Sequence, residues 1–227
     1  MRRSILSTAA LAMVMTGPAA AQQFEGVITM TVQGGRTGEL VQMFKNGKVR
    51  MEMQGPEGRG GAMLMEPGKS EVTMLMSSEK MYMVMDASAM ARRGGMAPDS
   101  APPKVTKVGT SETVAGRSCD NYLVGEKQDH EVCVAKGLGF FGGMGRGPMG
   151  RGRGAGGGMP ELASSELMAE FKDGFFPLKI SRIEGDKKAL VLEVTKIEVK
   201  PLPSSMFEVP EGYTKMDMPM GMPGGRP

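Results

Sequence analysis

Thioether side chains are the most abundant groups in this chain that could recognise a ligand, since 25 of its 227 residues are methionine. In residues 72–85, methionine recurs at every second position on either side of a polar turn at residues 77–80. Side chains alternate between the two faces of a strand, so each run places its thioethers on one face. Residues 49–53 show the same alternation. Together they predict one apolar surface, the methionine wall, formed by Val49, Met51, Met53, Met74, Met76, Met81, Met83 and Met85.

The methionine wall suggests two roles. Methionine is flexible and adapts to varied apolar shapes, so a curved sheet lined with it could hold an acyl chain. The alternative is an ordinary packed core in a chain that is rich in methionine. The sequence leaves both open.

A second methionine pattern lies at the C-terminus, where methionines again alternate with other residues. Thioethers favour Cu(I) over harder cations, so a flexible tail could enclose one such ion. Compositional drift would give the same pattern, and no histidine accompanies it. Binding of Cu(I) is therefore the alternative hypothesis for this chain, with the candidate ligands Met216, Met218, Met220 and Met222.

Side chains that commonly catalyse reactions are isolated in the sequence. The only histidine, His130, falls on a predicted strand, where we expect a surface residue and not a general base. The serines Ser111 and Ser164 have no adjacent base, and the two cysteines are not spaced as in C-x-x-C redox sites. We therefore expect a non-catalytic protein without a bound cofactor.

The cysteines Cys119 and Cys133 predict one disulfide, because an even count in an exported chain favours pairing. A hairpin centred on Glu126 would place them directly opposite each other, with Cβ atoms close to disulfide spacing.

Residues 1–21 predict a secretory signal peptide with cleavage after Ala21, and hence a periplasmic or secreted protein. Arg2 and Arg3 precede a short apolar run, and Ala19-Ala20-Ala21 offers a cleavage site. The run is too short to span a bilayer, and no later segment suggests a transmembrane helix in the mature chain. Without the leader, 26 of the 28 basic residues remain against 25 acidic ones, which argues against nucleic acid as a partner. The expected partners are a lipid or other apolar ligand, or a partner protein.

Alternating apolar runs separated by turn residues predict antiparallel strands over residues 22–216, including a hairpin at Asn46-Gly47. Residues 160–171 have the one convincing helical pattern. Residues 141–158 form a Gly/Arg-rich insert that we expect to be disordered, and residues 217–227 a flexible tail. The expected fold is mainly β (α+β), a curved antiparallel sheet or half-barrel with one or two short helices.

Three segments together resemble an uncharacterised family of exported bacterial proteins, domain of unknown function 4412. They are Phe24-Glu25-Gly26, residues 107–116 and residues 206–213, and the likeness spans residues 24–216 apart from the insert. That family is similar to the lipoprotein carriers of the LolA and LppX type. The resemblance implies a half-barrel with helices over its concave face and an apolar cavity between them. It also implies an apolar ligand or a lipoprotein-like partner.

Overall fold

The computed structural model describes residues 24–33, 38–53, 60–66, 69–86, 104–139, 171 and 174–216, most of which lie in strands. The strands are β1 Gly26–Val32, β2 Gly38–Lys45, β3 Lys48–Met53, β4 Gly61–Met65, β5 Glu71–Met76, β6 Met81–Asp86, β7 Val105–Val114, β8 Arg117–Val124, β9 His130–Lys136, β10 Phe175–Glu184, β11 Lys187–Val199 and β12 Thr214–Lys215.

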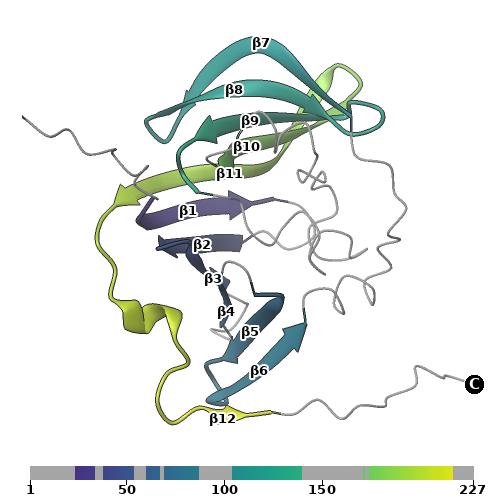
Figure 1. Cartoon of the computed structure of the whole chain (residues 1–227). Coiled ribbons are helices and arrows are strands. Elements are labelled where there is room, and N and C mark those ends of the chain that lie inside the picture. The colour runs from purple at the N-terminus through teal and green to yellow at the C-terminus, as the bar shows by residue number, and fades with distance from the viewer. Residues whose placement is uncertain are drawn as a thin grey trace, which may run out of the picture.

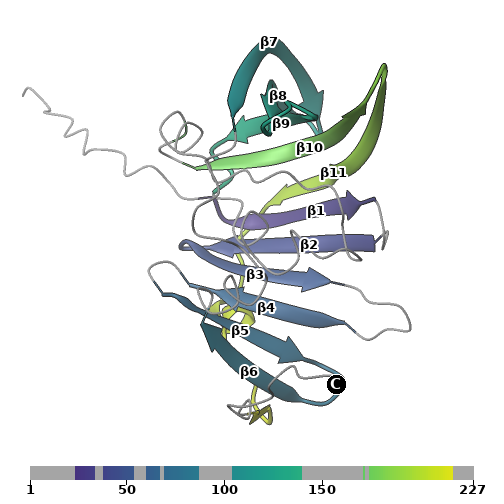
Figure 2. The same ribbon diagram turned by 90° about the vertical axis from the view of Figure 1, so that its right-hand side faces the viewer.

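All of these strands belong to one 12-stranded sheet, in the order β12-β6-β5-β4-β3-β2-β1-β11-β10-β9-β8-β7. Neighbouring strands are antiparallel except β12, which runs parallel to β6, so the sheet is mixed. Figures 1 and 2 show that the sheet is strongly curved and open, with β7 at one end and β12 at the other.

The expected α+β architecture with helices is wrong. Among the described residues no α-helix occurs, and the only helical element is the single 3-10 turn η2, Ser204–Phe207. Apolar residues on the outer side of the sheet pack against Leu202, Phe207 and Tyr213 of the C-terminal segment, which contains only this 3-10 turn. The helix expected at residues 160–171 lies outside the described residues except for Phe171, which is not helical. The leader, the Gly/Arg-rich insert and the tail at 217–227 also lie outside them.

Strands β1, β2, β4 and β5 contribute buried apolar residues from both faces, which pack separately. The inner face contributes Ile28, Met30 and Met51, among others, to the main core. The outer face contributes Val27 and Met43 to a second cluster. Successive residues of one strand thus enter different clusters, as the two-residue period of a strand requires.

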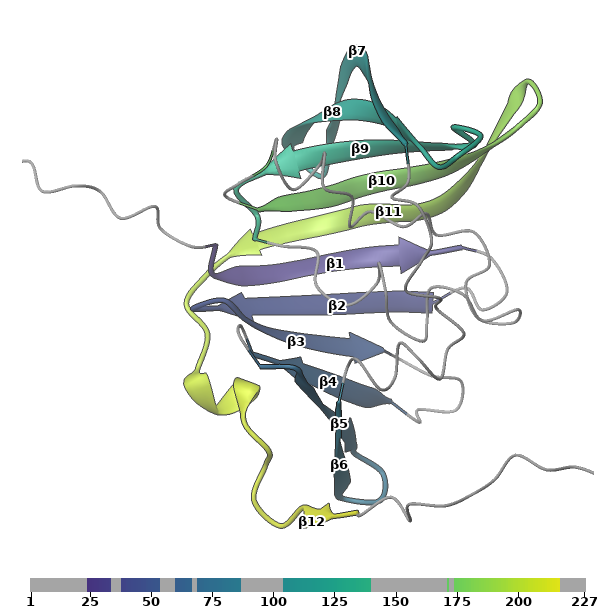
Figure 3. The same cartoon turned by 45° about the vertical axis from the view of Figure 1, so that its right-hand side comes forward.

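The outer face is covered by the C-terminal strap, residues 200–216, which Figure 3 shows running along one side of the sheet. Leu202 and Phe207 of the strap are buried in the second cluster. The Arg50 guanidinium of β3 donates a hydrogen bond to the Met206 carbonyl at 2.8 Å. Tyr213 then packs against a third cluster on β4 and β5, and β12 continues the sheet beyond β6.

The segment Phe24-Glu25-Gly26, where β1 begins, connects the strap to the sheet through Glu25. The Glu25 carboxylate accepts hydrogen bonds from the Lys45 ammonium and the Leu202 backbone amide, each at 2.7 Å. A Cβ atom at Gly26 would lie 2.1 Å from the carbonyl oxygen of Glu198, so a side chain there would push β11 away. Phe24 packs edge-on against Phe44.

The expected hairpin at Asn46-Gly47 is confirmed, with positive φ angles of 50° and 75° at these residues. Strand β7 is interrupted by a bulge between Lys107 and Ser111, where Gly109 has a positive φ angle. The Asp120 carboxylate accepts hydrogen bonds from Ser111 at 2.7 Å and Lys107 at 2.9 Å, on the two sides of this bulge. These bonds hold the pKa of Asp120 below its ordinary value.

Candidate functional site

The methionine wall predicted from the sequence lies on the inner face of β3, β5 and β6. Four methionines occupy one cross-strand row, because Met51 opposes Met63, Met63 opposes Met74, and Met74 opposes Met83. We call Met51, Met63, Met74 and Met83 the methionine row. The other wall positions pair in register with further residues of β3–β6. Met76 lies opposite Met81, and Met85 lies opposite Val72. In the backbone pairing of β3 with β4, Val49 lies opposite Met65 and Met53 opposite Gly61.

Exposure of the row increases toward β6. Met51 and Met63 are 1% and 7% exposed. On β5 and β6 the methionines are half-buried, namely Met74, Met76, Met81, Met83 and Met85. On the opposite face of β6, Val84 is 36% exposed. The methionine row is therefore buried at β3 and β4, and solvent reaches it at β5 and β6.

A buried amide continues the methionine row at its closed end. Gln42 of β2 opposes both Met51 and Ile28, and its side chain is 0% exposed. In the part of the chain that the structure describes, neither Oε1 nor Nε2 of Gln42 has a hydrogen-bond partner. Buried polar groups in native proteins are nearly always paired, so an unpaired one calls for an explanation.

Sequence reasoning missed Gln42 and also missed Met63 and Met65 of β4. The two methionines had the same alternating spacing as the rest of the wall, so the signal was present. Gln42 had no such signal, because it is the one polar residue in the apolar run 40–44.

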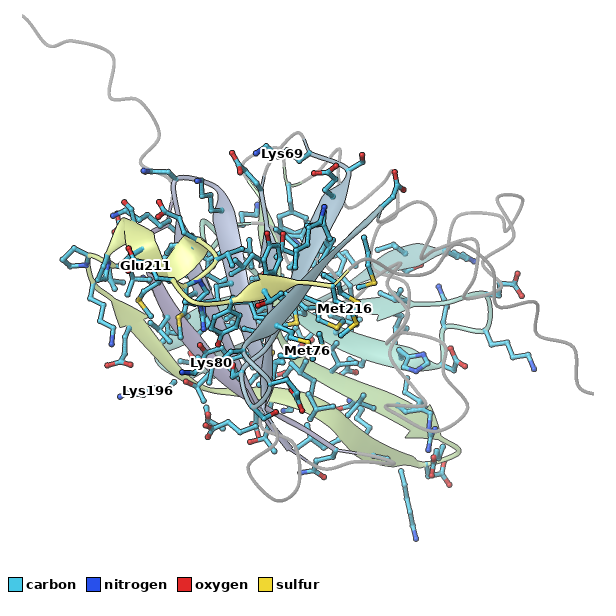
Figure 4. All side chains as sticks on the ribbon, turned by 90° about the horizontal axis from the view of Figure 1, so that it is seen from below. Lys69, Met76, Lys80, Lys196, Glu211 and Met216 are labelled. Carbon is cyan, nitrogen blue, oxygen red and sulfur yellow. A yellow bond between two sulfur atoms is a disulfide. The ribbon has the colours of Figure 1, made fainter. Side chains whose placement is uncertain are left out.

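The first methionine of the C-terminal pattern is not part of a loose tail. Thr214 pairs with Met81 and Lys215 with Tyr82, and the Met216 amide donates to the Tyr82 carbonyl at 2.8 Å. In this register Met216 follows beside Met83 on the inner face. Figure 4 labels Met216 and Met76 in a view from the β12 end.

The remaining metal candidates, Met218, Met220 and Met222, lie outside the described residues. Within the described ranges no group of three or more His, Cys, Asp or Glu side chains could hold a metal ion.

The predicted disulfide between Cys119 and Cys133 is present, with Cα atoms 5.3 Å apart and both residues buried. Its predicted register is wrong. Asn121, not Cys119, opposes Cys133, so the bridge is diagonal across β8 and β9. The hairpin is centred one residue later because Gly125 and Gln128 adopt positive φ angles in its turn.

His130 is 9% exposed, so the expected surface position is wrong. Its Nδ1 lies 3.0 Å from a carboxylate oxygen of Asp129, and Nε2 has no hydrogen-bond partner among the described residues. A carboxylate-oriented imidazole alone defines no reaction, since a general base also needs a proton to abstract within reach.

The described part of the chain contains no helix that is both long enough and apolar enough to cross a membrane.

The residues that the structure describes form an open, nearly all-β sheet with methionines along its inner surface. The chain belongs to the family described as Domain of unknown function (DUF4412), whose model matches residues 24–213. The family predicted from the sequence is thereby confirmed, and its description assigns no activity. No protein of curated function matches the chain.

Two solved structures are similar to this one at low sequence identity. A crystal structure of an uncharacterised conserved protein from Thermus thermophilus has a TM-score of 0.46 and 12% identity, covering 86% of this chain and 91% of that one. The structure of PNGF-II in a C2 space group has a TM-score of 0.43 and 11% identity, covering 85% of this chain and 30% of that one.

Proposed function

We propose that this protein is an exported, non-catalytic binding module that holds an apolar molecule of the acyl-chain class against the methionine wall. The acyl chain is either free or carried by a lipoprotein-like partner. The observation that carries the proposal is the graded exposure of the inner face, from 1% at Met51 to half-buried Met74 and Met83 in one continuous row.

The gradient favours a binding surface over a plain core. On β4 and β5, the strap packs on the outer face, where Leu64 and Leu75 are buried beside Tyr213. The inner-face methionines of β5 and β6 keep partial access to solvent. Accessible, unbranched thioethers can repack around apolar ligands of different shape, and contiguous apolar surface commonly marks such sites.

The disulfide supports export. Disulfides persist in oxidising compartments and are rare in the cytosol, so a Cys119–Cys133 bridge fits a periplasmic or secreted protein. It agrees with the leader predicted at residues 1–21, with cleavage after Ala21.

The test compares two adjacent substitutions on opposite faces of β6. Met83→Glu places a charge in the methionine row, whereas Val84→Glu places the same charge on the exposed outer face. Binding of a fluorescent fatty acid should weaken at least ~10-fold in Met83→Glu, because burying an unpaired charge is costly, and change less than ~2-fold in Val84→Glu. Equal binding by both variants, or no binding by the native protein and no co-purified lipid in native mass spectrometry, would refute the proposal.

A second candidate function is binding of Cu(I), which the position of Met216 favours. Met216 follows β12 directly, and continuing the β6–β12 register by one residue places it next to Met83, which lies opposite Met74. Three thioethers are a soft ligand set suited to Cu(I). Competition with a Cu(I) chelator under reducing conditions should show weaker binding after Met216→Leu and after truncation beyond Tyr213. Equal affinities in the native and altered chains would remove this candidate.

A further inference from the structure

The buried amide of Gln42 specifies the chemistry of the ligand beyond its apolar chain. We infer that the ligand carries a neutral group of the carboxamide class, which pairs with Gln42 while its acyl chain follows the methionine row toward β6. This inference rests on the proposed function and names the ligand class for the same face.

The first step is the hydrogen-bonding capacity of Gln42. Its side chain offers one acceptor oxygen and an NH2 group with two donors. Both atoms are buried and, within the described ranges, unpartnered. A ligand group satisfies them together only if it both donates and accepts, as a carboxamide does. An ester or ether only accepts, so it would leave Oε1 unpaired.

The second step is the apolar character of the residues around this amide. The inner-face residues that oppose Gln42 or flank it on β2 are all apolar, namely Ile28, Leu40, Phe44 and Met51. A carboxylate placed here would lose its hydration without gaining a cationic partner, which is strongly unfavourable. The surroundings therefore favour a neutral polar group over the ionised head of a fatty acid.

The third step is the direction in which the ligand lies along the methionine row. Gln42 marks the closed end of the row, and half-buried Met83 marks the accessible end. Neighbouring strands are about 4.8 Å apart, so the distance from β2 to β6 is roughly 19 Å, comparable to a long acyl chain. The ligand reaches Gln42 by displacing Met51 and Met63, whose side chains can rotate about several bonds.

The experiment uses the full mature chain and two ligands with the same hydrocarbon chain, oleamide and methyl oleate. The native protein should bind oleamide about tenfold more tightly, the value of roughly one additional hydrogen bond. Gln42→Met, which fits the surrounding row, should weaken oleamide binding to the affinity of the methyl ester. Gln33→Met, the same change at an exposed position at the end of β1, should leave the tenfold preference intact.

The outcomes separate this inference from the proposed function. Equal binding of the two ligands by the native protein would overturn the role of Gln42 and leave an apolar-ligand site standing. Binding of neither ligand would overturn the proposed function, and this inference with it. The melting temperature of Gln42→Met should match or exceed that of the native protein, because the change removes an unpaired buried amide. A clear drop would show that the chain itself supplies a partner, which would also overturn the inference.

Discussion

Substitution of Phe207 tests whether the strap stabilises the sheet. Its ring is 8% exposed and packs with three other buried residues, Val27, Met43 and Leu202. Truncation of a core phenylalanine to alanine costs about 3–5 kcal/mol. Phe207 lies in a 3-10 turn between half-buried Met206 and exposed Glu208, so the turn can partly collapse into the vacated space. We therefore expect Phe207→Ala to lower the free energy of unfolding by about 3 kcal/mol.

The same substitution should loosen β12. This strand has two residues, which pair with Met81 and Tyr82 of β6. The Thr214 amide donates to the Lys80 carbonyl at 2.9 Å, and the Met216 amide donates to the Tyr82 carbonyl at 2.8 Å. A few hydrogen bonds, each worth about 1 kcal/mol net, do not hold a segment against its conformational entropy. If the strap opens locally, loss of about 3 kcal/mol corresponds to roughly 100-fold faster exchange of these two amides.

Urea unfolding measures the first effect and hydrogen exchange the second. Val209→Ala is the matched control, because Val209 belongs to the same strap but is 37% exposed. It should change the free energy of unfolding by less than about 0.5 kcal/mol. A cost below about 1 kcal/mol for Phe207→Ala, or unchanged exchange at Thr214 and Met216, would show that the strap rests on the sheet without stabilising it.

Two further predictions concern the disulfide and the opening of β1. Replacing Cys119 and Cys133 together by alanine should lower the free energy of unfolding, measured in urea, by about 3 kcal/mol. This is the chain-entropy value for a closed loop of this length, so an unchanged free energy of unfolding would contradict the entropic reasoning. The hydrogen bonds from Lys45 and the Leu202 amide lower the pKa of Glu25, so its stabilisation is present above the unfolded pKa and is lost as pH falls through the folded pKa. The melting temperature should therefore fall between about pH 5 and 3, and less steeply in Glu25→Gln; equal slopes would show that Glu25 does not join strap to sheet.

The strands could be predicted because one type of side chain recurs at every second position along them. Residues 72–76 and 81–85 alternate with period two around a polar turn, and they form β5 and β6. β12 could not be predicted in this way. Thr214-Lys215 has no strand pattern of its own. It forms a strand only because the strap places it beside the edge of β6.

The hairpin register illustrates a second limit. The positive φ of Gln128 gives no signal in the sequence, since glutamine does not favour that conformation. One residue of difference in the turn changed which residues oppose each other, although the cysteines still pair.

Gln42 shows why the candidate site itself was only partly predictable. Its strand neighbours Val41 and Met43 are apolar because the strap packs on the outer face, and Leu40 and Phe44 are apolar because they belong to the inner core. When both faces of a strand are apolar, alternation does not reveal which face a polar residue occupies. The pairing of Gln42 with Met51 across β3 becomes visible only in the assembled sheet.

Residues 202–213 of the strap pack on the outer face and the methionine row lies on the inner face, so their contributions to binding should be separable. The strap pairs with the edge of β6 through β12, and β6 carries Met83 on its inner face. Phe207→Ala should therefore lower stability and, where β6 loosens, acyl-ligand affinity together. Met83→Glu should lower affinity without a comparable loss of stability, because Met83 is only half-buried. Val132→Ala is the control, because Val132 of β9 is buried in the main core and lies outside the cluster that holds the strap. If saturating ligand restores the melting temperature of Phe207→Ala but not that of Val132→Ala, binding and strap closure are coupled through β6; equal restoration would mean that the ligand stabilises the whole sheet uniformly.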